Sequence, residues 1–261
     1  MIGIFDSGIG GLTVVKELLR QLPQYQILYF GDTARLPYGT KGQETITKFG
    51  LEDAAFLESY GAHVIVIACN TASAVAASAI RAASKVSVFD VIVPAVEKAA
   101  QVTKNKRIGV IGTYATVNSG VYERLLKEKH PDMKVLGQAA PLLVPLVEEG
   151  WLKRPETKRI LKYYVRPLLQ QGVDTLILGC THYPFLKSML QQYVGRRVKL
   201  VDPAEEVAKE LAQYIKDHPE LEATLKKGSS HQFFLSDVTP RFQGIAEKWL
   251  GMKITIEKAS L

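Results

Sequence analysis

The chain of 261 residues contains two cysteines, and each stands at the head of a short polar segment. Cys69 opens the segment CNT, and Cys180 opens the segment CTH. A thiol has a reference pKa of about 8.5, so near neutral pH it can act as a thiolate base or as a thiol acid. His182 lies two residues after the second thiol and could tune it or share its proton. These segments are therefore the first candidates for chemistry.

Several kinds of protein could use two such thiols. A cysteine hydrolase would pair Cys69 or Cys180 with His182 as its base and leave the other cysteine dispensable. A racemase needs two acid/base groups on opposite faces of one carbon, so that one removes a proton while the other delivers one from behind. A two-domain protein for small anions would bind its ligand without exchanging any α-proton. Two thiols in comparable positions favour the racemase.

Racemisation of an amino acid makes a further demand, because the α-proton is weakly acidic. Without pyridoxal phosphate as an electron sink, the site must stabilise a carbanion-like transition state with hydrogen bonds and must exclude water. The polar side chains near the cysteines and near the start of the chain are the available partners: Asp6, Ser7, Asn70, Thr71, Thr181 and His182.

The segment DSGIGG, residues 6–11, follows a short apolar run and precedes a helical pattern. Its glycines allow a tight turn and leave amides free at a helix N-terminus, which suits a carboxylate or a phosphate. It is neither the GxGxxG dinucleotide fingerprint nor a P-loop. The alternative is a tight turn in which Asp6 caps the helix.

Short apolar runs predict the strands that position these segments. Several of them are apolar throughout, as expected for strands buried on both faces of a parallel sheet. The predicted strands are 2–5, 27–30, 63–68, 86–89, 107–111, 134–137, 174–179 and 197–201.

Helical patterns lie between these strands, and strand–helix alternation predicts an α/β fold with parallel sheets. Pro23 and Gly61 mark the ends of the first two helices. The segment 216–230 is polar and is interpreted as a linker or surface excursion before a last strand and helix at 231–250. The predicted helices are 12–22, 43–60, 72–84, 114–129, 155–171 and 203–217.

The chain also has a weak internal repeat. The opening MIGIFDSGIGGLTVVKELL is echoed by RIGVIGTYATVNSGVYERLL from residue 107, and VIVIACNTAS is echoed by TLILGCTHYP. The repeat predicts two similar domains that face each other, each with a parallel sheet flanked by helices. Because sites form at the carboxyl ends of parallel strands, Cys69 and Cys180 are expected in the cleft between the domains.

Composition excludes several other classes. Lys and Arg number 33 against 26 Asp and Glu, but the basic residues are scattered and no nucleic-acid motif is present. No Cys/His cluster has metal-ligand spacing, so no metal is expected. The start MIGIFDSG lacks the features of a signal peptide, and no apolar run reaches the roughly 18–20 residues that cross a bilayer. The expectation is a cytoplasmic protein with no nucleic-acid or membrane partner.

Taken together, five motifs resemble the glutamate racemases of the aspartate/glutamate racemase superfamily over essentially the whole chain. They are DSGIGG at 6–11, PYG at 37–39, ACNTAS at 68–73, VPLVEEG at 144–150 and GCTHYP at 179–184. The resemblance implies interconversion of L- and D-glutamate without a cofactor or metal, and a supply of D-glutamate for bacterial peptidoglycan. Aspartate racemase is the alternative within the superfamily, because it would use the same two cysteines.

The resemblance also implies a role for each site residue. Cys69 would deprotonate one enantiomer and Cys180 the other, with Asp6 assisting Cys69 and His182 assisting Cys180. A glutamate of VPLVEEG would orient His182, and Glu149 is preferred over Glu148. The implied substrate contacts are Asp6, Ser7, Tyr38, Gly39, Asn70, Thr71, Thr113, Thr116, Thr181 and His182.

The resemblance further implies a homodimer and a discontinuous first domain. Residues 1–96 and 207–261 would form that domain, and residues 97–206 would form the second. The repeat alone indicates two consecutive halves and gives no sign of this return.

Overall fold

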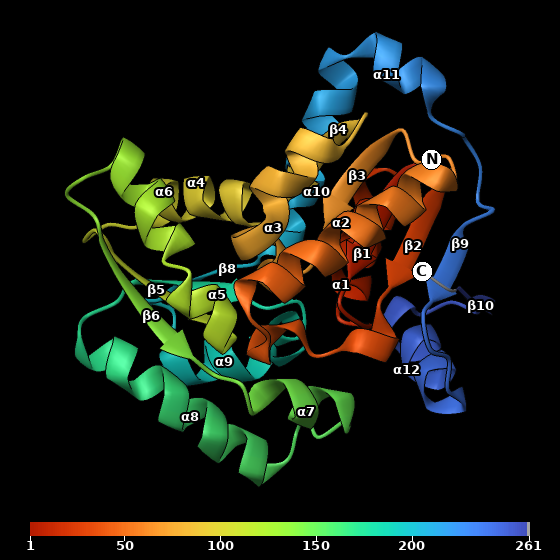
Figure 1. The fold of residues 1–261 in the computed structure, drawn as a ribbon. Helices are drawn as coiled ribbons and strands as arrows, with labels where there is room; N and C mark the ends of the chain where they lie inside the picture. The colour runs from red at the N-terminus through yellow and green to blue at the C-terminus, as the bar shows by residue number, and fades with distance from the viewer. Residues whose placement is uncertain (260–261) are drawn as a thin grey trace.

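The computed structural model describes residues 1–259, apart from the side chain of Arg241. Its strands form two separate parallel sheets with helices packed on both faces, and the two sheets lie side by side in Figure 1. This arrangement confirms the predicted α/β class.

In the described part of the chain, the first sheet has six strands in the order β10-β9-β2-β1-β3-β4, and the second has four in the order β6-β5-β7-β8. The strands of the first sheet are β1 (Ile2–Asp6), β2 (Ile27–Gly31), β3 (Val64–Ile67), β4 (Ser87–Asp90), β9 (Gln232–Leu235) and β10 (Ile256–Lys258). Those of the second sheet are β5 (Arg107–Gly112), β6 (Lys134–Ala139), β7 (Thr175–Gly179) and β8 (Lys199–Val201).

Helices and short 3-10 turns connect these strands. The longer helices are α1 (Leu12–Gln21), α2 (Gln43–Ser59), α3 (Asn70–Ala83), α4 (Ile92–Val102), α6 (Val121–Lys129), α8 (Pro155–Gln170), α9 (Lys187–Val194), α10 (Pro203–Asp217) and α12 (Pro240–Leu250). The shorter ones are α5 (Tyr114–Asn118), α7 (Leu143–Glu148) and α11 (Pro219–Thr224), with 3-10 turns η1 (Thr33–Arg35), η2 (Tyr38–Thr40) and η3 (Tyr183–Leu186).

The internal repeat corresponds to equivalent strand orders in the two sheets. β1 lies between β2 and β3 just as β5 lies between β6 and β7, and every pair is parallel. Ile2 is paired with both Ile27 and Val64, and Ile108 is paired with both Val135 and Thr175. In each half, the carboxyl end of the central strand therefore lies between the carboxyl ends of its two neighbouring strands.

The elements differ from the predicted ones at several places, and the helices α4, α7 and α9 were not predicted. The predicted helix 114–129 is broken into α5 and α6 at Gly120, which has a φ of 65° that glycine adopts without steric cost. The helix after Cys69 begins at Asn70 rather than at residue 72. The segment interpreted as a linker contains α11, and β10 follows α12 as an unpredicted edge strand.

The C-terminal segment returns to the first sheet, where β9 pairs with β2 and β10 pairs with β9. The boundaries at 96/97 and 206/207 remain a prediction. They fall inside α4 and α10, which contact each other, so these two helices link the halves.

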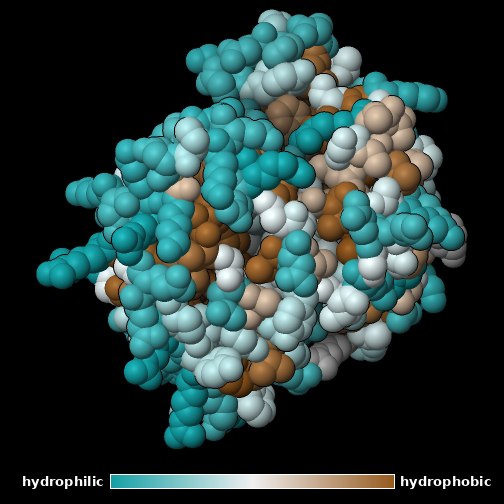
Figure 2. All heavy atoms as spheres, turned by 60° about the vertical axis from the view of Figure 1, so that its left-hand side comes forward, coloured by the Kyte–Doolittle hydropathy of each residue, from teal (hydrophilic) through white to brown (hydrophobic). Residues whose placement is uncertain are grey.

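The core is continuous from one half to the other, since one buried apolar cluster contains Ile4 of β1 and Val110 of β5. The face in Figure 2 is largely hydrophilic, with hydrophobic atoms in scattered smaller areas. Among the described helices, none is long and apolar enough to span a membrane.

Candidate active site

Cys69 lies two residues after the end of β3 and is the N-cap residue of α3. Its sulfur accepts a hydrogen bond from the backbone N–H of Ala72 at 3.5 Å and lies 3.6 Å from the Ser7 hydroxyl. A helix N-terminus lowers a thiol pKa in general. Here burial, followed by the nearby Asp6 carboxyl, outweighs that effect and raises the pKa of Cys69 to about 12. The thiol form therefore prevails at neutral pH.

Asp6 ends β1 and is completely buried. Its Oδ2 accepts hydrogen bonds from the backbone N–H groups of Gly8 at 3.1 Å and Gly11 at 3.0 Å. Burial raises the pKa of Asp6, while the charge of His182 and these amides act in the opposite direction. Two amides of the DSGIGG turn thus bind the chain's own carboxyl group, which supports the capping interpretation of this segment.

Cys180 and His182 occupy the equivalent junction after β7. The Sγ of Cys180 lies 3.8 Å from Nδ1 of His182, and the Nε2 of His182 lies 3.0 Å from Oε1 of Glu148. Burial lowers the pKa of His182, but the contacts with Cys180 and Glu148 outweigh it and raise that pKa to about 10. The imidazole is therefore protonated at neutral pH.

The preference for Glu149 as the partner of His182 is wrong, because the hydrogen bond comes from Glu148. Glu148 is the last residue of α7, whereas Glu149 is its exposed C-cap. Side chains one residue apart on a helix point about 100° apart, so only one of the two can face the imidazole.

Hydrogen bonds between the two halves bring these junctions together. The hydroxyl of Thr71 lies 2.9 Å from that of Thr113 and 3.3 Å from that of Thr116. The hydroxyl of Thr181 donates to Oδ1 of Asp6 at 3.4 Å. Each half therefore contributes polar groups to one shared site.

A cavity of about 310 Å³ lies between the two junctions, and both cysteines line it. The residues of the predicted site that line it are Ser7, Tyr38, Gly39, Cys69, Asn70, Thr71, Thr113, Cys180, Thr181 and His182, together with Glu148. Asp6 and Thr116, both fully buried, lie behind these residues, so direct contact of either side chain with a ligand is not supported.

Two glycines allow the halves to approach closely. A Cβ on Gly10 would lie 2.3 Å from Oγ1 of Thr181, and a Cβ on Gly39 would lie 2.5 Å from Cβ of Thr113. Both distances are too short for real side chains, so glycine is required at these positions by tertiary contact. Gly39 thus brings the PYG segment against the second half.

Several residues at the site carry no recognisable signal in the sequence. Leu36 lines the cavity, and the Tyr122 hydroxyl donates to Oδ1 of Asn70 at 2.8 Å from the opposite half. Trp249 of α12 packs edge-on against the His182 ring, with the ring centroids 6.1 Å apart. Tyr122 and Trp249 reach the site through contacts over long sequence separations, and Leu36 directly precedes the PYG motif but is an ordinary apolar residue, so motif spacing could not identify them.

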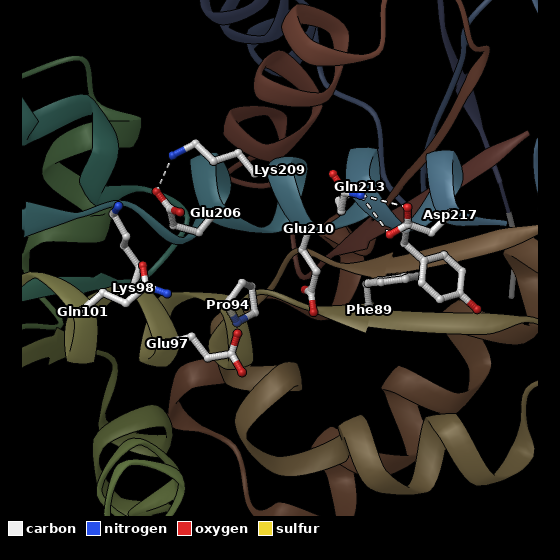
Figure 3. Close-up of a pocket in the computed structure, with 11 residues that line it drawn as sticks. Phe89, Pro94, Glu97, Lys98, Gln101, Glu206, Lys209, Glu210, Gln213 and Asp217 are labelled. Carbon is white, nitrogen blue, oxygen red and sulfur yellow. Dashed lines mark hydrogen bonds and ion pairs between the residues drawn. The ribbon is translucent and has the colours of Figure 1, made fainter. Parts of the chain in front are cut away.

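A second hollow, of about 410 Å³, lies between α4 and α10. Figure 3 shows charged and amide side chains around it, among them Glu97, Lys98 and Glu210. It contains neither cysteine, and its lining is typical of a solvated groove. Within residues 1–259, no group of three or more His, Cys, Asp and Glu side chains is arranged to hold a metal ion.

The protein has two halves, each built on a parallel sheet, and each half brings one thiol to a shared cavity. This arrangement defines a class of α/β proteins equipped for proton transfer to and from a small ligand. Residues 2–211 match the model of the Asp/Glu/Hydantoin racemase family. The glutamate racemase of Geobacter metallireducens is 46% identical over 97% of this chain and 93% of its own length. The chain belongs to the glutamate racemase family, as the motifs led us to expect.

Solved structures agree with this assignment. A glutamate racemase from Bacillus anthracis is 38% identical with a TM-score of 0.94, and the match covers 100% of this chain and 97% of that one. A glutamate racemase from Francisella tularensis, solved in complex with D-glutamate, is 36% identical with a TM-score of 0.90 and coverages of 99% and 97%.

Proposed function

We propose that this chain interconverts L- and D-glutamate by moving the α-proton between Cys69 and Cys180. The observation that supports this best is that both thiols line one cavity, each from the strand-to-helix junction of one half. Full-length similarity to glutamate racemases, one of them solved with D-glutamate, supports glutamate as the substrate.

The reaction is a proton transfer on each face of one carbon. A thiolate removes the α-proton, and the electrons of the broken C–H bond remain on the α-carbon. The thiol on the other side then donates its proton to the opposite face, which inverts the configuration. The two cysteines have exchanged protonation states at this point and are set for the reverse reaction.

The surroundings of the two thiols indicate which one acts first as the acid and which as the base. Cys69 carries its proton, since burial raises its pKa to about 12, and it is therefore the first acid. Cys180 is then the first base, and Nδ1 of His182 lies 3.8 Å from its sulfur as its acid/base partner. In the reverse direction the α-ammonium group of the bound amino acid supplies positive charge to the Cys69 thiolate.

The cavity supplies the groups that hold the substrate. Hydroxyl and amide groups of Ser7, Asn70 and Thr71 lie on one side, and those of Thr113 and Thr181 lie on the other. A volume of about 310 Å³ suits a small amino acid. Asp6 acts through the groups in front of it, and Thr116 acts through Thr71 and Thr113.

We also propose the domain boundaries of this enzyme. We assign 1–96 with 207–261 to one domain and 97–206 to the other, which agrees with the pairing of β9 and β10 in the first sheet.

Both thiols are free, as expected for the reducing cytoplasm. We further propose a homodimer whose D-glutamate feeds peptidoglycan synthesis.

The deciding experiment is incubation of the protein with L-glutamate in D₂O without added cofactor, with optical rotation and α-deuterium followed together. We expect D-glutamate to form with deuterium at the α-carbon, and much slower turnover of L-aspartate. Faster turnover of aspartate would make this an aspartate racemase. No exchange with either amino acid would refute racemisation and leave the hydrolase and anion-binding interpretations.

A further inference from the structure

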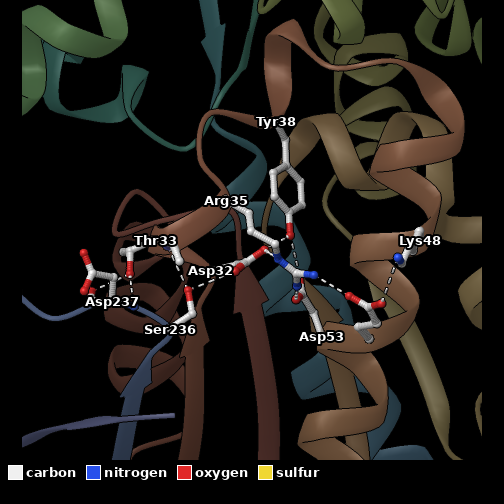
Figure 4. Close-up of polar contacts among 10 residues, drawn as sticks. Asp32, Thr33, Arg35, Tyr38, Lys48, Asp53, Ser236 and Asp237 are labelled. Carbon is white, nitrogen blue, oxygen red and sulfur yellow. Dashed lines mark hydrogen bonds and ion pairs between the residues drawn. The ribbon is translucent and has the colours of Figure 1, made fainter. Parts of the chain in front are cut away.

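A buried polar cluster lies behind the segment 36–40, which supplies one wall of the cavity through Leu36, Pro37, Tyr38 and Gly39. Figure 4 shows the Tyr38 hydroxyl pointing toward Asp32 and Asp53, with Arg35 beside them. Asp32 follows β2, and Asp53 lies on α2, so the cluster joins the segment to two elements of the first half.

The contacts within the cluster are short and specific. The Tyr38 hydroxyl is hydrogen-bonded to Oδ2 of Asp32 and, at 2.8 Å, to Oδ2 of Asp53. Arg35 donates from Nε to Oδ2 of Asp32 at 2.6 Å and from Nη2 to Oδ1 of Asp53 at 3.0 Å. Both carboxyl groups and the Tyr38 ring are almost completely buried.

Proton counting shows that these contacts need one more proton than the ordinary ionisation states provide. A tyrosine hydroxyl has a single proton, so it can donate to only one of two ionised carboxylates. Burial, with the charges of Asp53 and Asp32, raises the pKa of Tyr38, so its proton stays on the phenol. The second contact is a hydrogen bond only if one carboxyl group carries a proton and donates it to the phenol oxygen.

The donors around each carboxyl group identify which one is protonated. Asp32 accepts from Nε of Arg35 and, through Oδ1, from the Ser236 hydroxyl at 2.9 Å, in addition to Tyr38. Apart from the Tyr38 contact at Oδ2, Asp53 accepts only from Nη2 of Arg35 among the contacts described, and that bond uses Oδ1. More donors stabilise a negative charge better, so Asp32 is the carboxylate and Asp53 is the acid.

The charged groups facing Asp53 lead to the same assignment. Burial raises its pKa well above the usual range, and the negative charge of Asp32 adds to this effect. Tyr38 and Arg35 act in the opposite direction, and Glu52 on α2 raises the pKa further. Arg35 is shared among Asp32, Glu52 and Asp53, so its single charge cannot balance all three.

We propose that Asp53 is a neutral carboxylic acid that donates from Oδ2 to the Tyr38 hydroxyl and so fixes the segment 36–40 as a wall of the substrate cavity. Asp53 is thus a positioning residue that touches no substrate. Its effect on glutamate binding rests on the proposed racemase function, whereas its protonation does not.

Conservative substitutions separate the two carboxyl groups. In Asp53→Asn, the amide NH₂ can donate to Tyr38 and the amide oxygen can accept from Arg35. The KM of this variant for glutamate should therefore stay within about threefold of the wild-type value, because a hydrogen bond is exchanged rather than lost. Asp32→Asn and Tyr38→Phe should raise KM about tenfold to a hundredfold with a smaller change in kcat, as expected for loss of a buried charge-assisted hydrogen bond.

Glu52→Gln is the matched control, because Glu52 contacts the same Arg35 but is partly exposed. It should leave KM unchanged. If Asp32→Asn leaves KM unchanged while Asp53→Asn raises it strongly, Asp32 is the acid and Asp53 the carboxylate, and the proposal is overturned.

Infrared spectroscopy tests the protonation without any assay. The wild-type spectrum at pH 7 minus that of Asp53→Asn should contain the C=O stretching band of a buried protonated carboxylic acid, and the wild-type spectrum minus that of Glu52→Gln should not. Absence of the band from the first difference spectrum would overturn the proposal. This readout stands even if Asp32→Asn fails to fold or if the protein acts on another amino acid.

Discussion

The Nε2 of His182 lies 3.0 Å from Oε1 of Glu148, and this contact joins the second thiol of the site to α7. Through its other nitrogen the same imidazole faces Cys180. Glu148 therefore helps to keep His182 charged, although it lies 34 positions away in the sequence.

Replacement of Glu148 should alter the pH dependence of the reaction. Glu148→Gln removes a negative partner that raises the pKa of His182, so the imidazolium should be lost at lower pH. The alkaline limb of kcat/KM should shift to lower pH, and the rate should fall about tenfold to a hundredfold, as for a weakened charge-assisted hydrogen bond. Glu149→Gln, at the exposed end of the same helix, is the control. Equal effects of the two substitutions would contradict the assignment.

The charge of His182 should also link stability to pH. Its folded pKa is raised from 6.5 to about 10. Its contribution to stability is therefore complete below pH 6.5 and is lost as the pH rises toward 10. This His182 contribution to the free energy of unfolding should fall across this range by up to about 1.4 kcal/mol per pH unit, and His182→Asn should remove it.

Denaturant titrations between pH 6.5 and 9 would measure this slope. In that range Cys69 adds little, because its folded pKa is raised from 9.0 to about 12 and its own contribution is lost only at higher pH. Identical slopes for the wild type and His182→Asn would mean that the imidazole is neutral in the folded protein.

The positions of the two cysteines could be predicted, whereas the exact partner of His182 could not. The carboxyl ends of parallel strands lie at the same edge of a sheet. The residues that follow β3 and β7 were therefore expected to lie near the loops that follow the neighbouring strands. The choice between Glu148 and Glu149 depends on the rotation of α7 about its axis. That rotation is set by burial of Leu143 and Val147, which local sequence does not specify.

Contacts over long sequence separations limited the rest of the prediction. Thr116 was expected at the substrate; its side chain is buried, and its hydroxyl lies 3.3 Å from that of Thr71, 45 positions away, so its contact with the substrate stays a prediction. Tyr38 was expected to contact the substrate, and it lines the cavity. The binding of its hydroxyl to Asp32 and Asp53 was not expected, because their approach depends on how α2 packs on the first sheet.

Removal of either thiol should stop racemisation but leave a partial reaction. In Cys69→Ala, Cys180 can still remove the α-proton of one enantiomer and return a solvent-derived proton to the same face. We expect a loss of racemisation of at least about a hundredfold, the usual contribution of a general acid or base. α-Deuterium exchange in D₂O should persist for one enantiomer only, and Cys180→Ala should retain exchange of the other. Full racemisation by either variant would exclude the two-thiol mechanism.

The approach of Gly39 to Thr113 predicts a steric effect on substrate binding. A Cβ at position 39 would lie 2.5 Å from Cβ of Thr113, so Gly39→Ala must push the PYG segment away from the second half. Overpacking typically costs about 1–3 kcal/mol, so KM for glutamate should rise about tenfold or more while the fold is retained. Gly42→Ala, three residues along, meets nothing within 4 Å and should leave KM unchanged. Equal KM values for the two variants in initial-rate assays would show that the segment adjusts without displacing the cavity wall.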